Sequence, residues 1–347
     1  MAAPHFSIPV IDFSPFRSGS DPTRSDVARK VVSAFKEAGF MYVKNHGIAE
    51  ATISKVFKES ENFFALQDDV KDPLAWRDPR ANRGYTKIGR EQTTNANDPA
   101  EIAALREVAP DRKESFEIGL ETDPEFRNYW PPEQLVPDFR STMIHFYDAC
   151  HNLHMDIMRA IALGLGMDES YFDSVVNEAW HTLRLLNYPP VERRLLEGEG
   201  QTRAGAHSGK AHHSNDLYFQ SRPPIDYGSI TLLFQDDIGG LEIQNPYTFE
   251  YVPAPPISGT IVVNVGDLLA RWSNDLLRST MHRVVAPTRT GGDERLAPTR
   301  QSIAFFCNPN EGATVDCLPG CEGSEGPKYP KVNSGEYLVM RLSATYD

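Results

Sequence analysis

The stretch SITLLFQDDIGGLEIQ (229–244) decides the fold. Two short runs rich in branched and aromatic residues, 229–235 and 241–244, flank turn-forming Asp and Gly, which is the pattern of two strands joined by a short connection. Similar short runs, separated by Pro, Gly and Asn, lie at 183–188, 260–267, 282–286 and 301–307. Closely spaced short strands are typical of a β sandwich or barrel, and the jelly-roll class is favoured.

The residues before this region predict helices. Val27, Val31 and Ala34 recur at helical spacing after a helix-starting Asp-Pro pair. Helices first and strands later argue against a doubly wound fold. We expect strands at 8–14 and 40–48, helices at about 22–38, 51–64 and 141–165, and a loop-rich polar segment at 67–140. The chain then divides into an N-terminal cap region (1–140), linking helices (141–180) and a mainly β domain (181–347).

Composition favours a small-molecule substrate. The formal net charge is -13 and no basic run stands out, so nucleic acid and anionic membranes are disfavoured as partners. Four cysteines in 347 residues are too few for a disulfide scaffold and are interpreted as reduced thiols. We expect a cytoplasmic protein, because no secretory signal is visible and the most apolar helical region, 155–167, is too short to span a bilayer.

Two histidines and a carboxylate are candidate metal ligands. His207, Asp226 and His282 each lie at the edge of an expected strand. Such a set can occupy one face of an iron(II) ion and leave the opposite positions open for a cosubstrate and dioxygen. A single histidine at a strand end is more often solvated or hydrogen-bonded than a ligand, so the three residues need corroboration.

The sequence segments around these three residues supply the corroboration. RAGAHS, DYGSITLLFQDDIGGLEIQ, VVNVGDLLARWSND, STMHRVV and RQSIAFF occur in this order from residue 203 to 306. They resemble the double-stranded β-helix core of the iron(II)- and 2-oxoglutarate-dependent dioxygenases of the isopenicillin N synthase-like family. IPVIDFS (8–14) and AFKEAGFMYVKNHGI (34–48) resemble the helical cap that precedes that core. The resemblance implies Fe(2+), 2-oxoglutarate and O2 as cofactor and cosubstrates, with ascorbate as a reductant.

Arg300 and Ser302 are candidates for binding 2-oxoglutarate. They are two residues apart on a strand and therefore project to the same face. A guanidinium fork matches a carboxylate, and a hydroxyl can add one hydrogen bond. By resemblance they form the family's R-x-S motif, and Tyr188 matches a tyrosine that touches the same carboxylate. Leu186 departs from the family pattern, which often has asparagine there.

Four segments resemble the fungal thymine hydroxylases within this family: ANRGYTKIGRE, DPAEIAALREVAPDRKESFEIG, GDLLARWSND and NSGEYLVMRLSATY. This resemblance implies Arg184 as a hydrogen-bond donor to the substrate, Tyr227 beside the metal, and Phe306 as a ring that stacks on a flat heterocycle. Core packing is the alternative for Phe306. An arginine in an apolar strand must find a polar partner, which strengthens the interpretation of Arg184.

An insertion separates the first two metal candidates. The family writes them as His-x-Asp, whereas GKAHHSNDLYFQSRPPI (209–225) intervenes here. A retained intron is one explanation, since Gly209-Lys210 and Ile225-Asp226 can be encoded as splice sites whose removal preserves the frame. A surface loop is the second, because loop closure has a modest entropic cost. The third is that His212, His213 or Asp216 replaces a ligand.

Three functions remain open. The first is hydroxylation of a C–H bond, in a methyl group, of a small planar molecule such as thymine, with release of succinate and CO2. The second is oxidation of another small molecule in secondary metabolism. The third is a folded but inactive product whose metal motif is split by residues 209–225.

Overall fold

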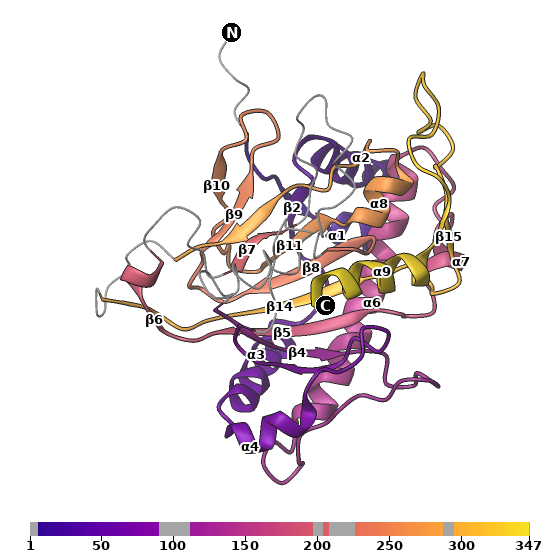
Figure 1. Ribbon diagram of the computed structural model, residues 1–347. Coiled ribbons are helices and arrows are strands. Elements are labelled where there is room, and N and C mark those ends of the chain that lie inside the picture. The colour runs from indigo at the N-terminus through magenta and orange to yellow at the C-terminus, as the bar shows by residue number, and fades with distance from the viewer. Residues whose placement is uncertain (1–5, 90–111, 197–203, 208–225, 287–294, 347) are drawn as a thin grey trace.

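The computed structural model describes residues 6–89, 112–196, 204–207, 226–286 and 295–346 (Figure 1). In these residues an eight-stranded sheet and a four-stranded sheet form the centre of the molecule. Two clusters of buried apolar side chains lie between the sheets, each with members from both. A larger cluster joins the opposite face of the eight-stranded sheet to the helices.

The large sheet has the order β1-β2-β11-β8-β14-β5-β4-β3. All its neighbouring pairs are antiparallel except β1 with β2. Its strands are β1 (Val10–Asp12), β2 (Phe40–Lys44), β3 (Gly84–Thr86), β4 (Glu114–Ile118), β5 (Thr182–Tyr188), β8 (Ile230–Gln235), β11 (Thr260–Val265) and β14 (Arg300–Cys307). The small sheet has the order β10-β9-β12-β7. Its strands are β7 (Ala204–His207), β9 (Leu241–Gln244), β10 (Tyr251–Pro253) and β12 (His282–Val284).

Helices cover the outer face of the large sheet, and α2 packs along the long helix α6. The α-helices are α1 (Ser14–Ser18), α2 (Asp21–Glu37), α3 (Glu50–Phe64), α4 (Asp68–Lys71), α6 (Phe139–Gly164), α7 (Asp173–Val176), α8 (Asp267–Trp272) and α9 (Ser334–Tyr346). The shorter elements are η1 (Asp72–Leu74), η2 (Arg193–Leu195), β6 (Val191–Glu192), β13 (Leu296–Ala297), β15 (Thr314–Val315) and β16 (Val332–Asn333). Within the described ranges, none of the helices has the length and apolar character needed to cross a membrane.

Side-chain alternation separates packing from chemistry. On β14, Ile303, Phe305 and Cys307 are completely buried in the cluster that faces the helices. Because side chains alternate along a strand, Arg300, Ser302, Ala304 and Phe306 point the other way, toward the small sheet. Pairing extends this inner face across the sheet, since residues directly opposite on neighbouring strands share a face.

The mainly β class with a helical cap is confirmed, and the expected strands and helices are present with small changes at their ends. Within the segment expected to be loop-rich, 67–140, the structure has two strands, β3 and β4, that extend the large sheet. Strand β4 has the sequence ESFEI, whose two glutamates hide its apolar pattern. Both glutamates are buried, and each has a basic partner, Lys71 for Glu114 and Arg184 for Glu117. The domain bounds at 140 and 180 stay predictions.

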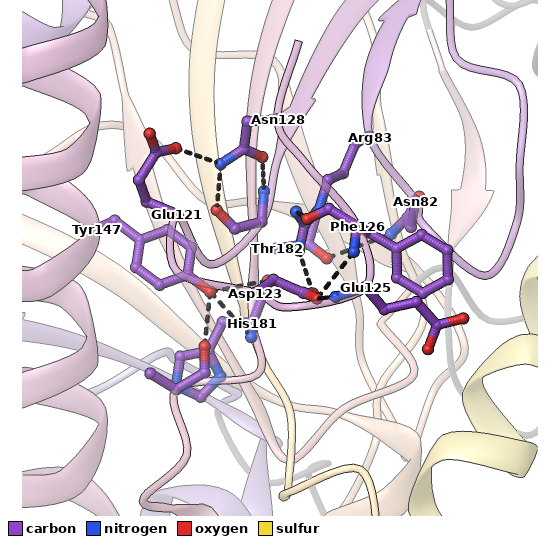
Figure 2. Close-up of polar contacts among 12 residues, drawn as sticks. Asn82, Arg83, Glu121, Asp123, Glu125, Phe126, Asn128, Tyr147, His181 and Thr182 are labelled. Atoms are coloured by element: carbon purple, nitrogen blue, oxygen red, sulfur yellow. Dashed lines mark hydrogen bonds and ion pairs between the residues drawn. The ribbon is translucent and has the colours of Figure 1, made fainter.

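Polar contacts fix the loop that follows β4. Arg83 is buried and its Nη2 lies 2.6 Å from Asp123 Oδ2. Asn128 donates from Nδ2 to the Gly119 carbonyl and accepts from the Gly119 amide. Figure 2 shows these contacts next to Tyr147, whose hydroxyl donates to the His181 carbonyl at the start of β5. The loop is thereby tied to the residue before β3, and α6 to the residue before β5.

Candidate functional site

Asp226 and His282 lie side by side on the inner side of the sheets. His282 is the first residue of β12, and its Nε2 lies 3.7 Å from Asp226 Oδ2. Both side chains are buried. Asn264 on β11 donates from Nδ2 to Asp226 Oδ2 at 2.5 Å, which orients the carboxylate. A buried carboxylate beside an imidazole is the start of a metal-binding arrangement.

The backbone places His207 at the same point. His207 ends β7 and is the direct antiparallel partner of His282. Residues 208–225, including His212, His213 and Asp216, lie outside the described residues. The two flanks of this segment are nevertheless held separately, because His207 pairs with β12 and the Asp226 carbonyl accepts a hydrogen bond from the Asp267 amide. Whether 209–225 is a loop or a retained intron therefore stays a prediction.

The donor chemistry at this point fits iron(II). Two histidines and one carboxylate would fill three positions, and the buried carboxylate Asp226 would supply a negative charge to offset the metal. Phe40 packs edge-on against the His282 ring, with 5.4 Å between ring centroids. This contact shields one side of the imidazole from solvent.

The buried side chain of Arg300 forms a second candidate binding position on the inner face, apart from the metal candidates. Its side chain is only 1% exposed, yet among the described residues its hydrogen-bond acceptors are uncharged: Gly239 O at 2.8 Å, Ser302 Oγ at 3.0 Å and Gln235 Oε1 at 3.3 Å. The Tyr188 ring centroid lies 4.9 Å from its Cζ. A buried cation with neutral acceptors is favourable only if an anion completes the site, so these residues fit a carboxylate such as that of 2-oxoglutarate.

Asp236 lies close to this arginine but is already engaged. Its two oxygens accept hydrogen bonds from the backbone amides of Ile238 and Gln301. Burial raises the pKa of its carboxyl above the ordinary value, against the opposing effects of these amides and of Arg300. Asp236 therefore shapes the turn beside Arg300, and an incoming carboxylate remains the natural counter-ion.

Arg184 and Phe306 are brought together farther along the inner face. Arg184 is buried on β5, and its Cζ lies 5.9 Å from the Phe306 ring centroid. Phe306 is partly exposed, in contrast to the completely buried Phe305 next to it. Phe306 therefore belongs to the inner face, where it packs against a small apolar cluster that includes Leu186 and Val284, so stacking on a substrate and core packing both stay predictions.

Tyr227 follows Asp226 directly but points its ring toward the C-terminal helix. It is buried in a cluster with Leu338 and Leu342 of α9, and Arg341 Cζ lies 5.6 Å from its ring centroid. Helix α9 is in turn connected to α8, because the Tyr337 hydroxyl donates to Asp267. The structure thus covers the residue next to the metal candidate with the last helix of the described chain.

A separate group of three histidines lies under the large sheet. Ring nitrogens of His151, His154 and His181 are within 4.8 Å of one another, close enough to share a metal ion. The Asn308 amide donates to His181 Nδ1, so the proton of this buried neutral ring belongs on Nε2, facing His151 Nδ1. A metal would have to displace that proton. The arrangement favours a hydrogen-bonded cluster, and the inner face is the better iron site.

Two residues of the inner face were not singled out from the sequence. Asn264 stands in the apolar strand VVNVGD, where a buried amide requires a partner, and that signal could have identified it. Glu117 is 1% exposed, and its Oε1 accepts from Arg184 Nε at 2.5 Å. Its signal was weak, because ESFEI has the composition of a polar segment.

Comparisons with known proteins agree with this geometry. Residues 8–136 match the N-terminal family described as non-haem dioxygenase in morphine synthesis, and residues 182–309 match the 2OG-Fe(II) oxygenase superfamily. A 2-oxoglutarate-Fe(II) type oxidoreductase of Metarhizium majus is 34% identical over 99% of this chain and 96% of its own length. A 2-oxoglutarate-dependent dioxygenase of Aspergillus rugulosus is 32% identical over 98% of this chain and 100% of its own.

A solved structure is similar over nearly the whole chain. Full-length Neurospora crassa thymine 7-hydroxylase, in complex with α-ketoglutarate and thymine, superposes with a TM-score of 0.86 and 46% identity, covering 98% of this chain and 97% of that one. Its complex with α-ketoglutarate and 5-formyluracil gives a TM-score of 0.83 and 42% identity, over 97% of this chain and 96% of that one. The chain belongs to the 2-oxoglutarate- and iron(II)-dependent oxygenase superfamily and is an oxidoreductase that uses iron, 2-oxoglutarate and dioxygen.

Proposed function

We propose that this oxygenase hydroxylates a methyl group of a small planar molecule, with thymine as the first candidate, and releases succinate and CO2. The observation that carries the proposal is the convergence of three groups on one inner face. These are the Asp226–His282 contact, the buried Arg300, and the neighbouring pair of Arg184 and Phe306. A metal, an anionic cosubstrate and a flat ring can therefore be held in one space.

In this proposal His207, Asp226 and His282 hold the iron, which would supply the activation of dioxygen for C–H oxidation. Arg300 and Ser302 hold the distal carboxylate of 2-oxoglutarate, and Tyr188 packs on the guanidinium. Asn264 keeps the Asp226 carboxylate in one orientation.

The substrate would lie against the Phe306 ring, with Arg184 donating to a carbonyl oxygen. The Tyr227 ring packs against α9, so it is left out of this arrangement. Stacking fixes the plane of a heterocycle, and one charged donor fixes its rotation within that plane. The similarity to the Neurospora crassa thymine 7-hydroxylase in complex with thymine supports this assignment. Such an arrangement would aim a single ring substituent at the iron.

Thymine-dependent succinate release by the iron-loaded protein is the test, with bound iron measured on the same sample. Succinate formed in proportion to thymine supports the proposal. Full iron occupancy without thymine-dependent succinate contradicts it. It would instead favour another small-molecule substrate, in line with the 32% identity to a proline hydroxylase of Petromyces alliaceus.

The same assay on a variant lacking residues 209–225 addresses the insertion. Equal iron binding and activity in the two proteins would mean that the segment is a harmless loop. Activity only in the shortened protein would support the retained-intron explanation and the inactive-product hypothesis.

A further inference from the structure

We infer that Glu117 determines specificity in this site, by neutralising Arg184 so that the pocket accepts uncharged planar substrates and rejects anionic ones. The inference rests on the proposed function, because it assumes that Arg184 faces the substrate. It adds a residue and a substrate class: a neutral ring that presents a carbonyl or amide edge to the arginine.

The contact itself is short and buried. Glu117 on β4 and Arg184 on β5 are direct antiparallel partners, so both side chains lie on the inner face. Arg184 Nε donates to Glu117 Oε1 at 2.5 Å, and the two side chains are 6% and 1% exposed. Ser115 Oγ donates to the same oxygen at 2.7 Å. The carboxylate is therefore fixed beside the guanidinium.

The pair lies within the site. The row of partners across the sheet runs from Glu117 through Arg184 to Ala304, two residues from Phe306 and two from Ser302. The Arg184 guanidinium lies 5.9 Å from the Phe306 ring centroid. A ligand that stacks on Phe306 therefore meets the electrostatic field of both charges.

Two buried arginines on one face differ in a way that decides what each can bind. Among the described residues, Arg300 donates to uncharged oxygens and the nearby Asp236 accepts from backbone amides, so an anion there can form a direct ion pair with the guanidinium. Arg184 already has a carboxylate at 2.5 Å. A second anion at Arg184 would lie close to Glu117, and like charges at short distance inside a protein repel strongly. The first arginine is thus suited to 2-oxoglutarate and the second to a neutral acceptor.

The chain offers a matched control on the same strand. Glu114 is also buried, but it points to the helix side, where Lys71 Nζ donates to it at 3.1 Å and Asn187 Nδ2 at 2.8 Å. Replacing it removes a buried charge from β4 without touching the inner face. Glu114→Gln therefore reports what a purely structural loss on this strand does.

The experiment compares an isosteric pair of probes, 3-methylbenzamide and 3-methylbenzoate, which differ only in the charge of the group meta to the methyl group. Binding of each is measured by calorimetry to the protein loaded with iron(II) and 2-oxoglutarate without oxygen. In Glu117→Gln the side-chain amide oxygen of the new glutamine can still accept a hydrogen bond from Arg184, so the fold is retained. We expect the benzoate-to-benzamide affinity ratio to rise at least about tenfold in this variant and to stay within about twofold in Glu114→Gln.

Kinetics supply the second readout. In Glu117→Gln the KM for thymine should rise while the KM for 2-oxoglutarate stays at the wild-type value, since Arg300 is untouched. An unchanged probe ratio in Glu117→Gln, an equal change in Glu114→Gln, or no benzoate binding to Glu117→Gln overturns the inference. A third outcome separates the two proposals. If the wild-type protein does not oxidise thymine but Glu117→Gln still shifts the probe ratio, thymine is wrong as the substrate and the inference about Glu117 stands.

Discussion

Mild acid should destabilise this protein through the histidines beneath its large sheet. Both His154 and His181 are buried. Burial lowers the pKa of His154 to about 3, and burial lowers the pKa of His181 well below its ordinary value of 6.5. In the unfolded chain both rings regain that ordinary pKa. Below pH 6.5 the two histidines therefore bind protons in the unfolded state but stay neutral in the folded state. The free energy of unfolding falls as a result.

The size of the effect depends on how far the pH lies below 6.5, the pKa of the histidines in the unfolded chain. Each histidine that stays neutral in the folded state lowers the free energy of unfolding by about 1.4 kcal/mol per pH unit once the pH is below 6.5. At pH 5 this amounts to about 2 kcal/mol for His154, and His181 lowers the stability further in the same direction. Typical domains have only about 5–15 kcal/mol in total, so the loss should be plain. For His154 it continues down to its folded-state pKa of about 3.

Urea unfolding between pH 7.5 and 5 measures the slope directly. His154→Gln keeps a donor for Ser229 Oγ, which lies 3.0 Å from His154 Nε2, but does not titrate. The unfolding free energy of this variant should therefore fall less steeply as the pH is lowered, with a slope smaller by that of about one bound proton. His145→Gln, on the exposed side of the same helix, should leave the slope unchanged. A His154→Gln slope equal to the wild-type slope would refute the reasoning.

Three further substitutions test the inner face. Asn264→Ala frees the Asp226 carboxylate and should weaken iron(II) binding about 10- to 100-fold in a metal titration; unchanged affinity would contradict a positioning role. Ser302→Ala removes one hydroxyl beside the guanidinium and should raise the KM for 2-oxoglutarate about tenfold with little change in kcat, as steady-state kinetics would show. Phe306→Ala should raise the KM for thymine, whereas Phe305→Ala should cost about 3–5 kcal/mol in urea unfolding; the reverse pattern would mean that the two faces are misassigned.

How much of the fold was predictable depended on where the polar side chains find their partners. Strands such as β14 and β11 were visible because apolar residues dominate them. Strand β4 was missed because its glutamates form ion pairs with Lys71 and Arg184, which lie far away in the sequence. Local periodicity cannot show that a charge is buried and paired. Helix α9 was missed as well, since its apolar residues are interrupted by charges and small residues.

The site was predictable to the extent that one segment carried it. Arg300 and Ser302 share a strand, so their common face followed from spacing, and their hydrogen bond agrees with it. Asp226 and His282 came from family resemblance and lie in contact. Glu117 was not predictable, because its role depends on the register between β4 and β5, which no local pattern specifies.

The position of β2 has a consequence for how the chain can be shortened. This strand lies between β1 and β11, and residues 260–264 of β11 pair with residues 40–44. A product that began after Lys44 would leave β11 as a bare sheet edge with Ile261 and Val263 next to open backbone donors and acceptors. Such edges recruit strands from other molecules. Loss of the first strands should therefore yield aggregates, and versions of the protein trimmed at the amino terminus should be recovered from inclusion bodies.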